Sequence, residues 1–191
     1  MPMKKAIGSG ALRIDVRTAK MALAAALCAL MYEWFLPSRS PAFACIGVIF
    51  GMGETLEDSR LHGGNRLFGT IIGGVLGMLL YRVYLFIRPQ GGQSLWLVPL
   101  MFVGVVLLNL CCRTLWAGGL HPGGVVLCIL LFNTPAATYV TYAVDRIIDT
   151  AVGVLFAWGI SYFLPRTWME MIRHSIEAHR HTHTHHYPKK K

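Results

Sequence analysis

The amino-acid sequence predicts an all-α integral membrane protein whose six transmembrane helices form two inverted three-helix repeats. Three observations lead to this prediction. The chain of 191 residues is 54% hydrophobic and only 14% charged, whereas about a quarter of the residues in a soluble domain are charged. Apolar stretches follow one another along the chain, and most reach the roughly 20 residues needed to cross a bilayer. A short motif also occurs twice, which indicates two related halves.

The repeated motif has the pattern Arg-x-x-x-Thr-x-x-Gly and lies within residues 65–73 and 145–153. Its arginine, threonine and glycine fall at the same offsets in both copies, and two apolar residues follow each arginine. We expect each copy to open a long apolar helix. Arg66 and Arg146 would then place one fixed positive charge at the mouth of the last helix of each half.

The net charge of +9 belongs mostly to the two ends of the chain. Five of the 18 basic residues lie in the first 20 positions and six lie from residue 166 onward. Cytoplasmic flanks of a membrane protein account for such ends, and no groove-reading motif points to nucleic acid. The five cysteines lack zinc-like spacing, so we expect small apolar-type side chains and neither metal nor cofactor.

Six spans follow from the apolar stretches and their proline and glycine breaks, at about residues 16–36, 41–53, 66–87, 94–112, 120–140 and 146–164. The second is short, and we expect it to reach the far side by continuing through the polar residues 54–59. The fifth is interrupted by Pro122, Gly123, Gly124 and Pro135. Broken segments at matching places in two halves indicate a transport site.

Three spans per half reverse the second half, giving inverted repeats over about residues 14–88 and 94–164. Six spans return both basic ends to one side, which the positive-inside rule makes cytoplasmic. We therefore expect residues 1–165 to form a multi-pass domain in the inner (cytoplasmic) membrane, with N- and C-termini cytoplasmic. Residues 166–191 are expected to form a basic amphipathic and His-rich cytoplasmic tail, solvated or lying on the inner membrane face.

The candidates for substrate binding are Arg66, Arg146 and Lys20. An arginine at the bilayer centre costs from about 3 to more than 10 kcal/mol, so each arginine should lie near a mouth or face a wet cavity. A guanidinium matches carboxylate geometry, and a helix N-terminus adds free N–H groups. Two interpretations stay open for each arginine: contact with an anion, or a helix cap that reaches the headgroups. For Lys20 the alternative is an ordinary positive-inside anchor.

Two carboxylates are candidates for coupling transport to protons. Asp149 lies three residues after Arg146, on the same helix face, where an ion pair forms easily. A structural ion pair is the simpler role, and a coupling proton is the functional one. Glu54 ends the apolar second segment and has a loop position as its alternative. No catalytic nucleophile or phosphate-binding loop is present, so we do not expect an enzyme.

Small residues form ridges for helix packing. Gly69, Gly73 and Gly77 share one face of the third predicted span, and Gly153 and Ala157 repeat the last two positions in the sixth. Such ridges let helix backbones approach closely in a bilayer. Close packing alone is sufficient to explain these glycines.

Four segments together resemble the aromatic acid exporter family, within the wider superfamily of fusaric acid resistance (FUSC) proteins and aluminium-activated malate channels: residues 17–25, 41–55, 64–70 and 146–150. The resemblance covers roughly residues 20–153. It implies a six-helix unit that acts as a homodimer and moves organic anions, by proton-driven export or as a channel. Members commonly carry a substantial cytoplasmic domain after the last span, and this chain continues with only a short tail.

Taken together, the sequence predicts a transporter that exports organic carboxylate anions, aromatic ones among the candidates, across the lipid bilayer, coupled to protons. Arg66 and Arg146 would attract the anion from opposite mouths. Two alternatives stay open: a passive organic-anion channel, and a membrane interaction or assembly protein without a solute pathway.

Overall fold

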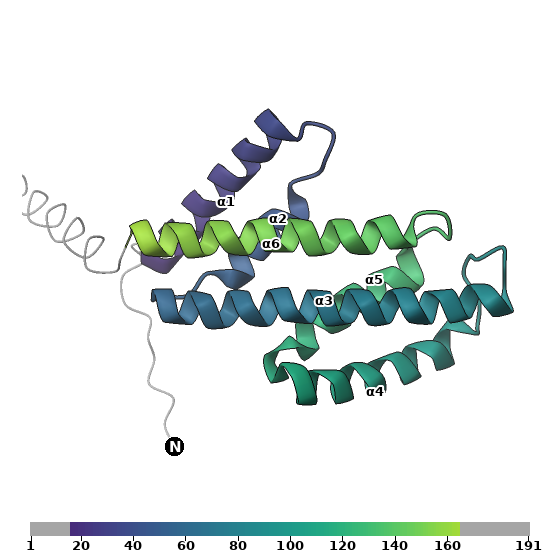
Figure 1. Ribbon diagram of the computed structural model, residues 1–191. Coiled ribbons are helices and arrows are strands. Elements are labelled where there is room, and N and C mark those ends of the chain that lie inside the picture. The colour runs from purple at the N-terminus through teal and green to yellow at the C-terminus, as the bar shows by residue number, and fades with distance from the viewer. Residues whose placement is uncertain (1–15, 165–191) are drawn as a thin grey trace, which may run out of the picture.

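The computed structural model describes residues 16–164, which fold into six α-helices and one short 3-10 helix with no β-strand (Figure 1). In chain order the elements are α1 (Val16–Phe35), α2 (Ala42–Gly51), α3 (Leu56–Ile87), α4 (Leu97–Leu115), η1 (Ala117–Gly119), α5 (Leu120–Asn133) and α6 (Tyr139–Phe163). Among them, α3 and α4 are long and apolar enough to cross a bilayer. The tail predicted for residues 166–191 lies outside the described residues.

The first and fourth helices lie close to their predicted places. α1 ends at Phe35, before Pro37, which cannot continue the helical hydrogen bonding. α4 begins at Leu97 rather than at residue 94, after a turn that contains Gly91 and Gly92, both at positive φ. The proline and glycine residues therefore correctly predicted where α1 ends and where the turn before α4 lies.

The connection between α2 and α3 differs from the prediction. α2 ends at Gly51, and the polar residues 54–59 do not extend it. Instead Thr55 caps α3: its hydroxyl accepts the Asp58 N–H at 3.1 Å, and the Asp58 carboxylate accepts the Thr55 N–H at 3.2 Å. This capping box fixes the start of α3 at Leu56, well before Arg66.

The last helix also begins earlier than predicted. Thr134 adopts an extended conformation before Pro135, as a residue preceding proline favours, and α5 stops at Asn133. α6 then begins at Tyr139, seven residues ahead of Arg146. Both motif arginines therefore lie inside their helices, and their predicted position at the helix N-termini, beside free N–H groups, is wrong.

The two longest helices, α3 and α6, lie side by side and run in opposite directions (Figure 1). Gly63 of α3 lies against Trp158 of α6, whereas Gly74 lies against Ile147. Residue numbers thus rise along α3 as they fall along α6. The indole N–H of Trp158 donates to the Ser59 carbonyl at 2.8 Å and ties the end of α6 to the start of α3.

Each of these helices carries a shorter helix across its glycine ridge. A Cβ on Gly73 would meet the backbone of Gly123, so α5 packs directly on α3. A Cβ on Gly153 would meet the backbone of Ala44 and Gly47, so α2 packs in the same way on α6. The ridge residues leave no room for a side chain at either crossing.

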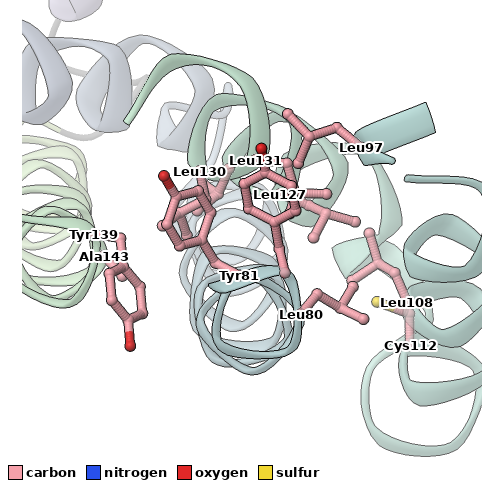
Figure 2. Packing of buried hydrophobic residues seen from close by; sticks show 12 residues of the cluster. Leu80, Tyr81, Leu97, Leu108, Cys112, Leu127, Leu130, Leu131, Tyr139 and Ala143 are labelled. Atoms are coloured by element: carbon pink, nitrogen blue, oxygen red, sulfur yellow. The ribbon is translucent and has the colours of Figure 1, made fainter. Parts of the chain in front are cut away.

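Apolar side chains fill two clusters between the helices. The larger joins α3, α4, α5 and the beginning of α6 (Figure 2). Within it, the rings of Tyr81 and Tyr139 stack with their centroids 4.9 Å apart. The Tyr81 hydroxyl donates to the Thr134 carbonyl at 2.9 Å and holds the α5–α6 turn on α3. The second cluster joins α1, α2 and the later part of α6. A cavity lies between α2, α3 and α5.

Candidate substrate-binding site

Arg66 lies on the side of α3 that faces α2 and α5, and only 9% of the residue is exposed. Its Nε is buried without a hydrogen-bond partner in the part of the chain that the structure describes. The Phe50 ring of α2 lies 5.4 Å from Cζ and gives the guanidinium a cation–π contact. A cation that is buried without a counter-ion carries a desolvation cost, so this position favours an anionic ligand.

A cavity of about 660 Å³ lies beside Arg66. Three parts of the bundle form its walls: α2, the beginning of α3, and the η1–α5 segment. The lining residues are Phe43, Ile46, Phe50, His62, Asn65, Arg66, Gly118, His121, Pro122, Val125 and Ile129. The volume is within the range of about 300–1,000 Å³ that small-molecule sites occupy.

The wall from α2 follows from helical spacing. Phe43, Ile46 and Phe50 are three and four residues apart, so they share one face of the helix. Gly47 lies on another face, against the α6 backbone. α2 is therefore held by α6 on one side and presents two phenyl rings to the cavity on the other.

The polar part of the wall comes mainly from α3 and α5. His62 lies one turn before Arg66, and His121 comes from the first turn of α5. Asn65 is held by Trp116, whose indole N–H donates to the amide oxygen at 2.7 Å. One fixed positive charge in a largely apolar and aromatic cavity suits an organic anion whose body is apolar or aromatic.

Arg146 has a different environment. Its Nη2 lies 3.1 Å from Asp149 Oδ2, the ion pair that the sequence spacing predicts. The other Asp149 oxygen accepts the Tyr32 hydroxyl at 2.7 Å and lies 3.3 Å from Arg39 Nη2. The same Arg39 nitrogen donates to Asp145 at 2.7 Å. Two arginines and two aspartates thus form a neutral cluster, which we call the α6 charge cluster.

Phe43 lies between this cluster and the cavity. Arg146 Cζ is 3.5 Å from the centroid of the Phe43 ring and 4.8 Å from that of Tyr142. Phe43 is also a cavity-lining residue. Arg146 Nε and Nη1 are buried and have no hydrogen-bond partner among the described residues.

The predicted site residues do not gather in one place. Arg66 lines the cavity, whereas Arg146 and Asp149 belong to the α6 charge cluster and Lys20 is buried on α1. Glu54 is exposed in the loop between α2 and α3. Within the described residues, no three His, Cys, Asp or Glu side chains come together as a metal site requires.

Several residues at the two sites were not predicted from the sequence. Phe43 and Phe50 had a usable signal, because their spacing places both on one face of a short apolar helix. Tyr32 and Arg39 had none, because their contacts with Asp149 join segments more than 100 residues apart.

A helical bundle with candidate membrane spans, a buried guanidinium and an apolar cavity has the features of a membrane transport protein for organic anions. The family model of aromatic acid exporter family member 1 matches residues 12–164, so the chain belongs to the aromatic acid exporter family. This is a family of transporters rather than enzymes, and membership implies membrane export of aromatic acids. No curated relative and no solved structure matches the chain.

Proposed function

We propose that the chain binds aromatic carboxylates in the cavity beside Arg66 and exports them across the inner membrane in a proton-coupled cycle. One observation carries this proposal: a nearly buried guanidinium, which has no carboxylate partner within residues 16–164, forms part of the wall of an otherwise largely apolar cavity. The carboxylate of the substrate would accept hydrogen bonds from Arg66. Its ring would lie among Phe43, Ile46 and Phe50.

The buried position of Arg66 favours the binding of an acid. A guanidinium binds a carboxylate through two parallel hydrogen bonds, which is stronger and more directional than a single contact. Burial strengthens this attraction, because the surroundings screen charge less than water does. A neutral aromatic compound would keep the ring contacts and lose the charged ones, so the site should select acids.

We further propose that the two halves are inverted repeats around a shared pathway. The antiparallel α3 and α6 support this proposal, as do the matching crossings of α5 on α3 and of α2 on α6. Ile147 lies level with Gly74, so Arg66 and Arg146 differ in height by about nine residues, or roughly 13 Å. The anion would meet one arginine from each side, in a homodimer whose termini are cytoplasmic.

Asp149 is our first candidate for the coupling proton. The groups that face it are Tyr32 and Cys28 on α1, Arg39 in the α1–α2 loop and Arg146 on its own helix. A proton on Asp149 would leave Arg146 with an uncompensated charge and increase its attraction for an anion. Glu54, in the exposed loop, is the second candidate, and Lys20 would add positive charge at the cytoplasmic side.

The test is benzoate flux into proteoliposomes with and without an imposed pH gradient. We expect gradient-dependent flux for the unaltered protein and a loss of at least about tenfold for Arg66→Gln, which removes the charge and keeps a polar side chain. Arg82→Gln is the matched control, because Arg82 is exposed on the same helix. Normal flux through the Arg66→Gln protein would overturn the proposed site.

The same assay distinguishes the exporter from the two alternatives, a passive channel and a membrane assembly protein. Flux that needs Arg66 and ignores the pH gradient would keep the site and make the protein a passive channel. Absence of benzoate flux through the unaltered, folded protein would favour a membrane assembly role.

A further inference from the structure

The Arg146 guanidinium is contacted by an aromatic ring and a carboxylate that belong to different elements. The Phe43 ring of α2 lies over it at 3.5 Å, and the Asp149 carboxylate pairs with Nη2 at 3.1 Å. An aromatic acid would supply the same two groups from one molecule. We propose that Arg146 forms a second aromatic-carboxylate subsite, which Phe43 and Asp149 occupy as internal substitutes for the ligand.

The guanidinium has donors left for such a ligand. Arg146 Nε and Nη1 are both buried without a hydrogen-bond partner among the described residues. Asp149 uses only Nη2. Each of these donors can give an incoming carboxylate one hydrogen bond. The two-bond geometry that guanidinium groups favour becomes available when Asp149 leaves Nη2, because Nη2 shares one edge with Nε and the other with Nη1.

Asp149 can release Arg146 without becoming an isolated buried charge. Its Oδ1 already accepts the Tyr32 hydroxyl and lies 3.3 Å from Arg39. Removing one partner from a buried ion pair is costly when the other is left alone. Here Arg39 stays beside the carboxylate, so the cost of exchanging Asp149 for a ligand is reduced.

Phe43 provides the route between the two subsites. Its ring contacts Arg146 and also lines the cavity that contains Arg66. Phe43 is only partly buried, so its side chain can change rotamer toward the cavity. This movement would uncover the face of the Arg146 guanidinium to a ligand already held near Arg66.

The second subsite rests on the proposed function, since it takes the same aromatic carboxylate as the cavity beside Arg66. Its test is equilibrium binding of benzoate to the purified full chain, with benzyl alcohol as the neutral control. Arg66→Gln alone should weaken benzoate binding at least about tenfold. Adding Asp149→Asn, which keeps the shape of the side chain, should recover most of that loss by freeing Arg146.

Two further variants test whether the recovered benzoate binding depends on Arg146. Adding Arg146→Gln to the double variant should abolish the recovered binding. Arg66→Gln with Phe43→Leu should recover part of the binding by uncovering Arg146 while leaving Asp149 in place, and this pair decides the matter if the Asp149 variant does not fold. The proposal is overturned if no pair of changes improves on Arg66→Gln. It is also overturned if the recovered binding survives loss of Arg146. A failure of the proposed function looks different, since Arg66→Gln alone would then bind benzoate as the unaltered protein does.

Discussion

Arg66 and Arg146 occupy the same position in the two copies of one motif, but they differ in whether a carboxylate lies beside the guanidinium. Arg66 lies in the wall of a cavity and has no carboxylate partner among the described residues. Arg146 is covered by Phe43 and paired with Asp149, which Arg39 and Tyr32 also contact. Among the described residues, the guanidinium of the first copy has no carboxylate beside it, whereas the second copy contains its own anion.

A single position explains much of this difference. Three residues after the arginine, the first copy has Gly69 and the second has Asp149. A Cβ on Gly69 would meet the carbonyl oxygen of Gly119 in η1 and the Pro122 ring in α5, so the close approach of this segment excludes a side chain there. This packing thereby excludes from position 69 the counter-ion that the second copy has at Asp149.

The largest effect should come from removing the internal anion. Asp149→Ala leaves Arg146 buried without its carboxylate, so we expect the free energy of unfolding to fall by about 3–5 kcal/mol. The measurement is denaturant unfolding of the purified protein in detergent. Asp145→Ala, at the more exposed end of the α6 charge cluster, should cost no more than about 1 kcal/mol. Equal losses would show that burial of the ion pair is not what matters.

The next prediction concerns a feature that the two copies share, the close crossing of two helices at a glycine. Gly73→Ala and Gly153→Ala each place a methyl group against backbone of the crossing helix, and we expect each to destabilise the protein by about 1–3 kcal/mol. Gly159→Ala is the control, because a Cβ there would meet no atom within 4 Å. Thermal unfolding should rank Gly159→Ala as neutral or stabilising, and a similar loss at all three positions would contradict the ridge contacts.

A smaller effect should follow from making the first copy resemble the second. Asn65 matches Asp145 in the motif and lines the cavity. Asn65→Asp keeps the oxygen that accepts the Trp116 N–H and adds a negative charge near Arg66, so benzoate binding should weaken by about tenfold. Asp145→Asn in the other copy should change binding by less than about twofold. Unchanged binding by Asn65→Asp would argue against an anion at Arg66.

The smallest effect concerns the ring beside Arg66. Phe50→Leu removes the cation–π contact and keeps an apolar wall, and we expect benzoate binding to weaken about two- to fivefold, which corresponds to roughly 0.5–1 kcal/mol. Phe86→Leu, at a fully exposed position of α3, should have no effect on binding. Tighter binding by Phe50→Leu would mean that Phe50 competes with the ligand for the guanidinium.

The sequence predicted the helical class, the family and the Arg146–Asp149 pair, since hydropathy, motif strings and i,i+3 spacing are local signals. It misplaced the beginning of α3 because Glu57, Asp58 and Arg60 interrupt the apolar pattern, although Thr55 and Asp58 have the spacing of a capping box. It could not predict that Phe43 separates the two arginines. That arrangement depends on which face of α2 packs on α6, and this is decided by tertiary contacts.

The most direct test of the central claim compares benzoate binding by the unaltered protein, Arg66→Gln and Arg146→Gln, each purified and shown to be folded. We predict that Arg66→Gln weakens binding at least about tenfold, whereas Arg146→Gln leaves it within about twofold because Asp149 already occupies that guanidinium. Equal losses in the two variants, or a larger loss for Arg146→Gln, would contradict the division of roles between the two copies.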